Sequence, residues 1–161
     1  MELKNAHACF GGAQRYYEHH SSEIGMAMKF SVYLPPKAVM GEKVPALLYL
    51  AGLTCTEETF MTKAGAQRLA SELNVALICP DTSPRGAGLA GESDSWDFGV
   101  GAGFYLDATT KPWALHWRME SYILNDLLPL IEKKLPVDMD RLGIFGHSMG
   151  GHGALTLALR H

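Results

Sequence analysis

The chain has 161 residues, of which 47% are hydrophobic and 19% are charged, so its composition is that of a globular protein and not a disordered one. Its formal net charge of -3 provides no basic surface for nucleic acid or for an anionic membrane. No apolar run is long enough to cross a bilayer, and the first residues lack the apolar segment of a signal peptide. We expect a single domain over residues 1–161.

The three cysteines, Cys9, Cys55 and Cys79, are odd in number and widely spaced, which argues against a disulfide framework. They indicate reduced thiols in a cytoplasmic protein. Neither C-x-x-C nor H-E-x-x-H occurs, so we expect no zinc site. Residues 86–91 match G-x-G-x-x-G, but no strand pattern directly precedes them and no helix pattern follows, so we expect no nucleotide cofactor.

The N-terminal part predicts β structure. A strand at residues 8–10 breaks at two glycines, and residues 14–20 form either the second arm of a hairpin or a continuation past a bulge. His19 and His20 are adjacent, so on a strand they point to opposite faces and cannot easily share a metal; we expect both on the surface. Residues 26–34 alternate apolar and polar, which predicts a strand with one buried face.

Two apolar runs predict strands at the centre of a sheet. Residues 46–51 and 75–79 are apolar without alternation, as in parallel strands covered on both faces. The spacing of Thr54 and Glu57 fits a capping box, so we expect a helix to begin there.

Two helices are predicted beyond these strands. One spans residues 66–73, and we expect its inward side chains to be Leu69, Ala70 and Leu73. The other spans residues 116–135 and is kinked or split by its internal Pro129. Between the second apolar strand and this helix lies a long loop, residues 81–112, rich in glycine, serine and aromatic residues. Such loops are uncommon inside compact domains and usually functional.

The most informative stretch is residues 146–151, which match G-x-S-x-G with Ser148 at the centre. An apolar strand-type run precedes it, at 142–145, and a helix-type run follows, at 154–159. A serine on such a turn projects its hydroxyl clear of the backbone, and only small residues fit two positions away. The helix that starts at the serine would direct free N–H groups toward a developing oxyanion. The alternative is an ordinary glycine-rich turn with a solvent-facing serine.

Strands that alternate with helices predict an α/β fold with a mostly parallel sheet and an antiparallel N-terminal portion. Leu53 and Ser148 each follow the carboxyl end of a predicted strand. Because ligands bind at that edge of such sheets, we expect these two loops to form the site.

Several blocks of the chain resemble the N-terminal part of the S-formylglutathione hydrolases, also called esterase D, of the α/β-hydrolase fold. The matching blocks are residues 9–12, 28–36, 52–56, 81–86, 95–99, 101–105 and 146–154. The resemblance implies hydrolysis of the thioester S-formylglutathione to formate and glutathione in formaldehyde removal. It also implies a cytoplasmic and often dimeric enzyme that needs no metal or organic cofactor.

The resemblance and the chemistry agree on the roles of individual residues. Ser148 would be the acylated nucleophile, and the backbone N–H groups of Met149 and Leu53 would form the oxyanion hole. Cys55, Trp96 and His147 would border the substrate pocket. In this family the cysteine is associated with sensitivity to thiol reagents; the alternatives are a half-buried filler for Cys55 and a core aromatic for Trp96.

The chain departs from the family pattern in one respect. In α/β-hydrolases an acid and then a histidine follow the serine, but no Asp or Glu follows Ser148 and the only later histidines are His152 and His161. Upstream candidates such as Asp97, Asp107 and His116 would violate that order.

We therefore expect the base and its acid to be absent, and the sequence to be a truncated domain that lacks the C-terminal strands and helices. Alone it should be marginally stable and have little esterase activity. A general short-acyl carboxylesterase and a non-catalytic fragment are the alternative functions.

Overall fold

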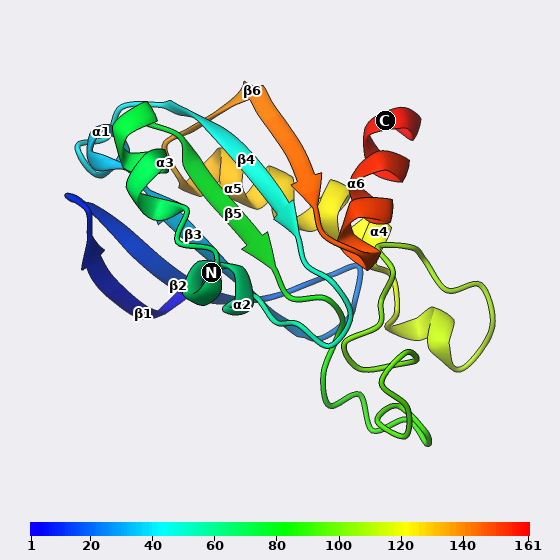
Figure 1. Ribbon diagram of the computed structural model, residues 1–161. Coiled ribbons are helices and arrows are strands. Elements are labelled where there is room, and N and C mark those ends of the chain that lie inside the picture. The colour runs from blue at the N-terminus through cyan, green and yellow to red at the C-terminus, as the bar shows by residue number, and fades with distance from the viewer.

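The computed structural model describes residues 1–161 and contains a six-stranded mixed sheet (Figure 1). The strands are β1 (Glu2–Cys9), β2 (Gly12–His20), β3 (Ala27–Leu34), β4 (Val44–Leu50), β5 (Ala76–Pro80) and β6 (Val137–Gly146). Their order across the sheet is β1-β2-β3-β5-β4-β6. Strands β1, β2, β3 and β5 pair antiparallel in turn, whereas β5, β4 and β6 run parallel. The predicted α/β fold with an antiparallel N-terminal portion is confirmed.

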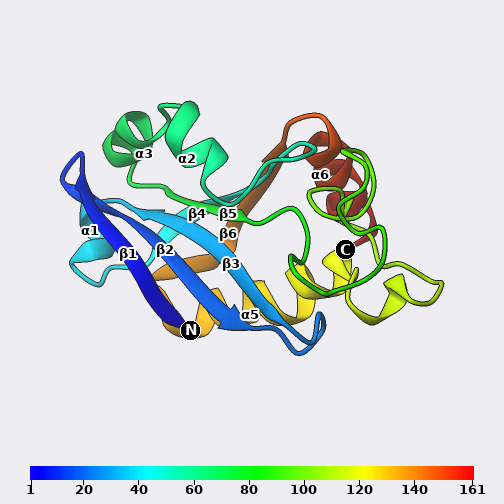
Figure 2. The same ribbon diagram turned by 90° about the horizontal axis from the view of Figure 1, so that it is seen from below.

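Short helices connect these strands. In chain order they are α1 (Pro36–Val39), α2 (Thr59–Lys63), α3 (Gln67–Leu73), the 3₁₀ turn η1 (Trp113–Leu115), α4 (Met119–Ser121), the π-helical η2 (Tyr122–Leu127), α5 (Leu128–Lys134) and α6 (Met149–Arg160). Helices α2 and α3 lie on one face of the sheet, and α5 runs along the other (Figure 2). None of the helices combines the length and apolar character that a membrane span requires.

The two faces of the sheet have separate apolar clusters. The larger contains Phe30, Leu48 and Ile78 from the strands and also includes Leu127 and Leu157 from the helical segments η2 and α6. The smaller consists of five buried residues on the side of α2 and α3: Tyr33, Met61, Ala70, Leu77 and Cys79. Successive residues of β5 alternate between the two clusters, and all five of its residues are buried. For β5 this explains the apolar run without alternation, because both faces are covered by helices. The same expectation for β4 was wrong: its burial alternates, and Leu47 is 37% exposed.

The N-terminal strands form the hairpin that was one of the two predicted possibilities. Phe10 and Gly11 have φ angles of 46° and 74°, the left-handed pair that a two-residue hairpin turn requires. Strand β1 begins at Glu2, earlier than predicted, and is exposed along nearly all its length. Because neither face of β1 is buried, its sequence does not alternate between apolar and polar residues, and the length of the strand could not be predicted.

The helix predicted near residues 116–135 is continuous from Met119 to Lys134, but before its proline it changes from α-helical to π-helical. Pro129 follows the π-helical η2 and stands in the first turn of α5. Proline cannot donate to the carbonyl of Asn125 four residues earlier, and its ring would clash with that carbonyl in a regular α-helix. The wider turn of η2 accommodates the missing hydrogen bond.

Two predictions about burial in the N-terminal strands were wrong. His19 is only 8% exposed, stacks on Tyr122 and bonds through Nε2 to its hydroxyl at 3.1 Å, although His20 is exposed. The polar face of β3 is also partly buried, because Ser31 and Tyr33 are fully covered on the side of α2 and α3. In both cases the covering residues come from distant parts of the chain.

Two predictions about helices were also wrong. Thr54 has a φ of 68° and caps no helix; α2 begins at Thr59 without a side-chain cap. In α3, Leu69 and Leu73 are 58% and 63% exposed, while Gln67 and Ala70 face inward. Tertiary contacts override the local pattern in both segments.

Candidate active site

Ser148 occupies the sharp turn between β6 and α6. Its backbone has φ 55° and ψ -120°, a conformation rare for a non-glycine residue, and its side chain is exposed. A Cβ added to Gly146 would lie 2.2 Å from the carbonyl oxygen of Gly150, and one added to Gly150 would lie 1.9 Å from that of Leu50. Side chains at these two positions are therefore excluded by backbone atoms, which explains why the turn needs glycine on both sides of the serine.

The loop after β4 approaches the serine directly. A Cβ added to Gly52 would lie 3.4 Å from Ser148 Cβ and 3.4 Å from the His147 carbonyl oxygen, so Leu53 is one residue from contact with the turn. The N–H groups of Leu53 and Met149 donate no hydrogen bond within the chain, whereas that of Thr54 donates to the carbonyl of Gly101 at 2.9 Å. The serine turn and the loop that approaches it therefore each carry a backbone N–H without a partner in the chain, as an oxyanion hole requires.

The loop 81–112 holds the strand-to-helix connection that carries Leu53. Gly101 accepts the N–H of Thr54 and in turn donates its own N–H to Ser83 Oγ at 2.7 Å. A Cβ added to Gly101 would lie 2.9 Å from Thr54 Cα, so the two backbones are in close contact. Through these contacts the long loop holds the segment next to Leu53, which agrees with the expectation that the loop is functional.

An ion pair secures the same connection from its other end. Arg85 bonds to both carboxylate oxygens of Asp81, at 2.7 and 2.8 Å, and to the Cys55 carbonyl at 3.0 Å. Thr82 also donates to that carbonyl, at 2.5 Å. The hydrogen bond to the buried Asp81 raises the pKa of Arg85, although partial burial of the guanidinium opposes it. The Cys55 carbonyl is thus fixed by two donors.

The three side chains predicted to border the pocket lie in different surroundings. Cys55 is half-buried. His147 is exposed, with Nδ1 3.4 Å from the position of a Cβ on Gly52. Trp96 is 68% exposed, which rules out the alternative of a core aromatic. No contact joins it to Ser148, so its role in a pocket stays a prediction.

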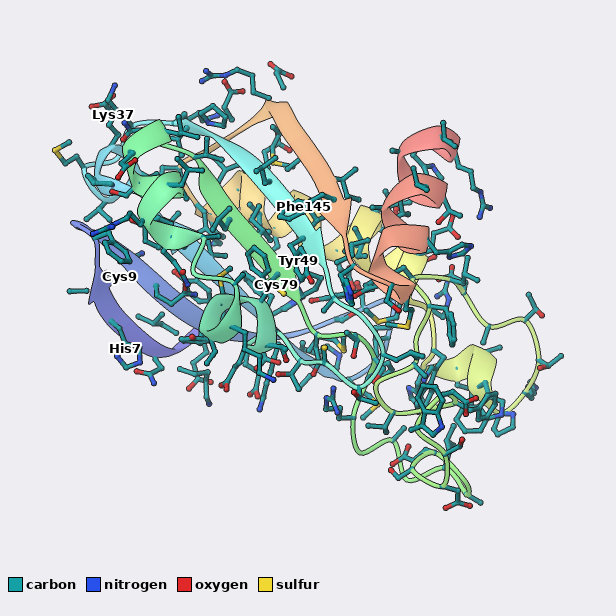
Figure 3. The ribbon with its side chains drawn as sticks, in the orientation of Figure 1. His7, Cys9, Lys37, Tyr49, Cys79 and Phe145 are labelled. Carbon is teal, nitrogen blue, oxygen red and sulfur yellow. The ribbon has the colours of Figure 1, made fainter.

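An aromatic cluster lies on the sheet just before the serine turn. Tyr49 stacks on Phe60 with ring centroids 4.0 Å apart and meets Phe145 edge-on at 5.0 Å. Figure 3 labels Tyr49, Cys79 and Phe145, which come from three neighbouring strands. Phe145 is 37% exposed, so this side of the site presents aromatic surface.

Sequence reasoning did not single out a cavity of about 510 Å³ in the loop 81–112 and the turns after it. Its walls include the aromatic side chains Phe98, Phe104, Trp113 and Trp117. Tyr105 lies in the chain between two residues that line the cavity, Phe104 and Leu106, and the sequence analysis did not single it out either. Phe104 and Tyr105 have left-handed backbone, with φ of 52° and 55°, which no local sequence pattern predicts.

Three of the residues considered as partners of Ser148, His116, His161 and Asp107, form hydrogen bonds elsewhere. His116 Nδ1 lies 2.7 Å from the Ile24 carbonyl oxygen, and His161 bonds to Glu120 at 3.0 Å. Asp107 accepts two hydrogen bonds from Ser121. No hydrogen bond joins the Ser148 hydroxyl to a histidine of these 161 residues.

The mixed sheet and the strained serine turn are those of the α/β-hydrolase fold. The esterase family model matches residues 21–161, and the chain belongs to this family.

Similar proteins agree with this assignment. The chain is 55% identical to S-formylglutathione hydrolase of Mus musculus and 53% identical to that of Paracoccus denitrificans, with 100% and 98% of the chain covered. It spans 57% and 56% of the length of those relatives. A solved S-formylglutathione hydrolase from Agrobacterium tumefaciens superposes with a TM-score of 0.96 at 48% identity, over 100% of this chain and 58% of that one. The resemblance seen in the sequence is confirmed.

Proposed function

We propose that the protein carrying this sequence is a serine hydrolase that cleaves S-formylglutathione to formate and glutathione. One observation carries the proposal: Ser148 is exposed with φ 55°, and neither the N–H of Met149 after it nor the N–H of Leu53 in the adjoining loop donates a hydrogen bond within the chain. The identity of 55% to S-formylglutathione hydrolase of Mus musculus supports the choice of substrate.

The proposed reaction has two steps. The Ser148 oxygen attacks the formyl carbon, the C–S bond breaks, and glutathione leaves as the thiol while the formyl group stays on the serine. Water then attacks the formyl-serine, which releases formate and returns the hydroxyl. In each step the negative charge on the carbonyl oxygen is stabilised by the N–H groups of Leu53 and Met149, which need not move to bind it.

A general base must take the serine proton in the first step and return it to the departing sulfur. We propose that this base and its orienting acid belong to the part of the complete protein that these 161 residues do not include. The chain spans 57% of the Mus musculus relative, which leaves ample length for both. A cytoplasmic role in formaldehyde removal, and assembly as a homodimer, are further parts of the proposal.

The proposal is tested on the complete protein with S-formylglutathione, by following loss of the thioester. Ser148→Ala should lower kcat by at least about 10³-fold, because removal of a nucleophile leaves only oxyanion and binding contributions. Ser93→Ala, which changes an exposed loop serine, is the control and should retain full activity.

Two further measurements define the reaction class. A fluorophosphonate probe should label the wild type and the Ser93→Ala variant but not Ser148→Ala. A higher kcat/KM on 4-nitrophenyl acetate than on the thioester would favour a general carboxylesterase instead. Full thioesterase activity in Ser148→Ala would contradict the proposal.

A further inference from the structure

Tyr105 connects the two parts of the candidate site. Its side chain is fully buried, and its hydroxyl donates to the carbonyl of Ala51 at 2.8 Å. Its φ is 55°, and that of Phe104 before it is 52°. Two successive non-glycine residues in this region persist only where the surrounding structure holds them. The contacts of Tyr105 are therefore specific, and burial raises the pKa of its hydroxyl, which stays a donor.

On one side, the segment of Tyr105 secures the loop that carries Leu53. Tyr105 binds the carbonyl of Ala51, two residues before Leu53, and Gly101 binds the N–H of Thr54, one residue after it. The Leu53 amide thus lies between two fixed points, both supplied by residues 101–105. No other side chain forms a hydrogen bond with Ala51.

On the other side, the ring of Tyr105 packs against helix α6. A Cβ added to Gly153 would lie 2.5 Å from Tyr105 Cδ2 and 2.9 Å from Cγ, so the ring rests on the helix backbone. Gly153 is four residues after Met149, about one helical turn away on the same face. The contact therefore fixes the first turn of α6, where the second free amide lies.

We infer that Tyr105 is a positioning residue that sets the separation between the Leu53 and Met149 amides. This rests on the proposed function, for which those amides are the oxyanion donors. The hydroxyl fixes one donor and the ring fixes the other, although Tyr105 does not touch the substrate. Stabilisation of an oxyanion depends on donor placement, and a displacement of about 1 Å can cost roughly 10²-fold in rate.

The test compares Tyr105→Phe with Tyr33→Phe in the complete protein. Tyr33 is a matched control, because it is also fully buried and its hydroxyl also donates to a backbone carbonyl, that of Cys9 at 3.2 Å. Both variants should lower Tm by similar amounts. Only Tyr105→Phe should lower kcat, by about 10-fold with KM unchanged, because it shifts a donor that acts in the transition state.

Hydrogen–deuterium exchange provides a readout that does not require turnover. In Tyr105→Phe the amides of residues 50–55 should exchange faster, and in Tyr33→Phe they should exchange as in the wild type. Gly153→Ala, which displaces the ring from the helix side, should also lower kcat. An unchanged kcat and unchanged exchange in Tyr105→Phe would overturn the inference. If the wild type does not hydrolyse the thioester, the proposed function fails, while the exchange result still decides whether Tyr105 positions the loop.

Discussion

The two connections that bring backbone amides to Ser148 are built in different ways. The turn from β6 to α6 is short, and its shape follows from the glycines on either side of the serine, where backbone atoms leave no room for a Cβ. The connection from β4 to α2 covers residues 51–58, and its shape depends on hydrogen bonds donated by Arg85 and Tyr105 and on one accepted by Gly101; Asp81 acts indirectly, by holding Arg85. One donor is therefore fixed by steric exclusion and the other by distant side chains.

This difference determines what a mutation can break. In the β6–α6 turn, a single added methyl group collides with backbone, and nothing nearby can move aside. In the β4–α2 connection, the bonds are distributed over several partners, so the loss of one weakens the loop without removing it. We expect large effects in the first region and graded effects in the second.

Gly150→Ala should have the largest effect. The added Cβ would lie 1.9 Å from the Leu50 carbonyl oxygen, and because that neighbour is backbone we expect a loss of about 3 kcal/mol, the upper end of the usual cost of overpacking. Urea unfolding of the complete protein should show this loss, together with loss of fluorophosphonate labelling.

The neighbouring Gly151→Ala provides the control. Its Cβ would meet nothing closer than 3.5 Å, and Ala in a helix is about 0.5–1 kcal/mol more favourable than Gly. This variant should be as stable as the wild type or slightly more so. Equal stability of the two variants would contradict the steric account of the turn.

Asp81→Asn should have an intermediate effect. It removes the bidentate ion pair with Arg85, whose side chain is 36% exposed, so after screening by solvent we expect a loss of about 1–2 kcal/mol. Because Arg85 also holds the Cys55 carbonyl, kcat for the thioester should fall as well.

Asp138→Asn is the matched control for this ion pair. Asp138 and Arg141 are joined at the same 2.7 Å distance between Oδ2 and Nε, but on the surface and away from the loop. Its Tm and kcat should not change measurably. Equal effects of the two substitutions on kcat would show that the Asp81 pair does not support the β4–α2 connection.

The same contrast explains which parts of the structure the sequence predicted. The β6–α6 turn could be predicted because its cause, two glycines around a serine, lies within a few residues. Strand β5 could be predicted because burial on both faces leaves an apolar run, whereas β4 is apolar although one of its faces leaves Leu47 exposed. The capping box at Thr54 was wrong because its backbone follows a bond to Gly101, far along the chain.

The resemblance to a known family supported the local patterns. It agreed with the strand pattern in predicting Leu53 as the second donor, and the structure brings the loop of Leu53 near Ser148. It did not identify Tyr105, although the residue lies in a matching block. A block of similar residues does not reveal which of them connects two elements.

In the N-terminal strands, His19 also depends on a distant residue, and its substitution should have the smallest effect on stability. Its burial depends on Tyr122, 103 residues further along the chain. Burial lowers the pKa of His19, partly offset by the nearby Asp126. The folded protein therefore keeps the imidazole neutral where the unfolded chain, with a pKa near about 6.5, takes up a proton. Stability from this site is complete above that pH and is lost as the pH falls toward the lowered pKa.

Thermal unfolding at pH 7, 6 and 5 would measure this loss. His19→Gln can still accept the Tyr122 hydroxyl but does not titrate, so its Tm should fall less than that of the wild type over this range. His20→Gln changes the exposed neighbour and should retain the wild-type pH dependence. Because His19 lies at β2 and not at either connection to Ser148, its substitution should leave kcat for the thioester unchanged at pH 7. A loss of pH dependence in His20→Gln, but not in His19→Gln, would assign the proton to the exposed ring instead.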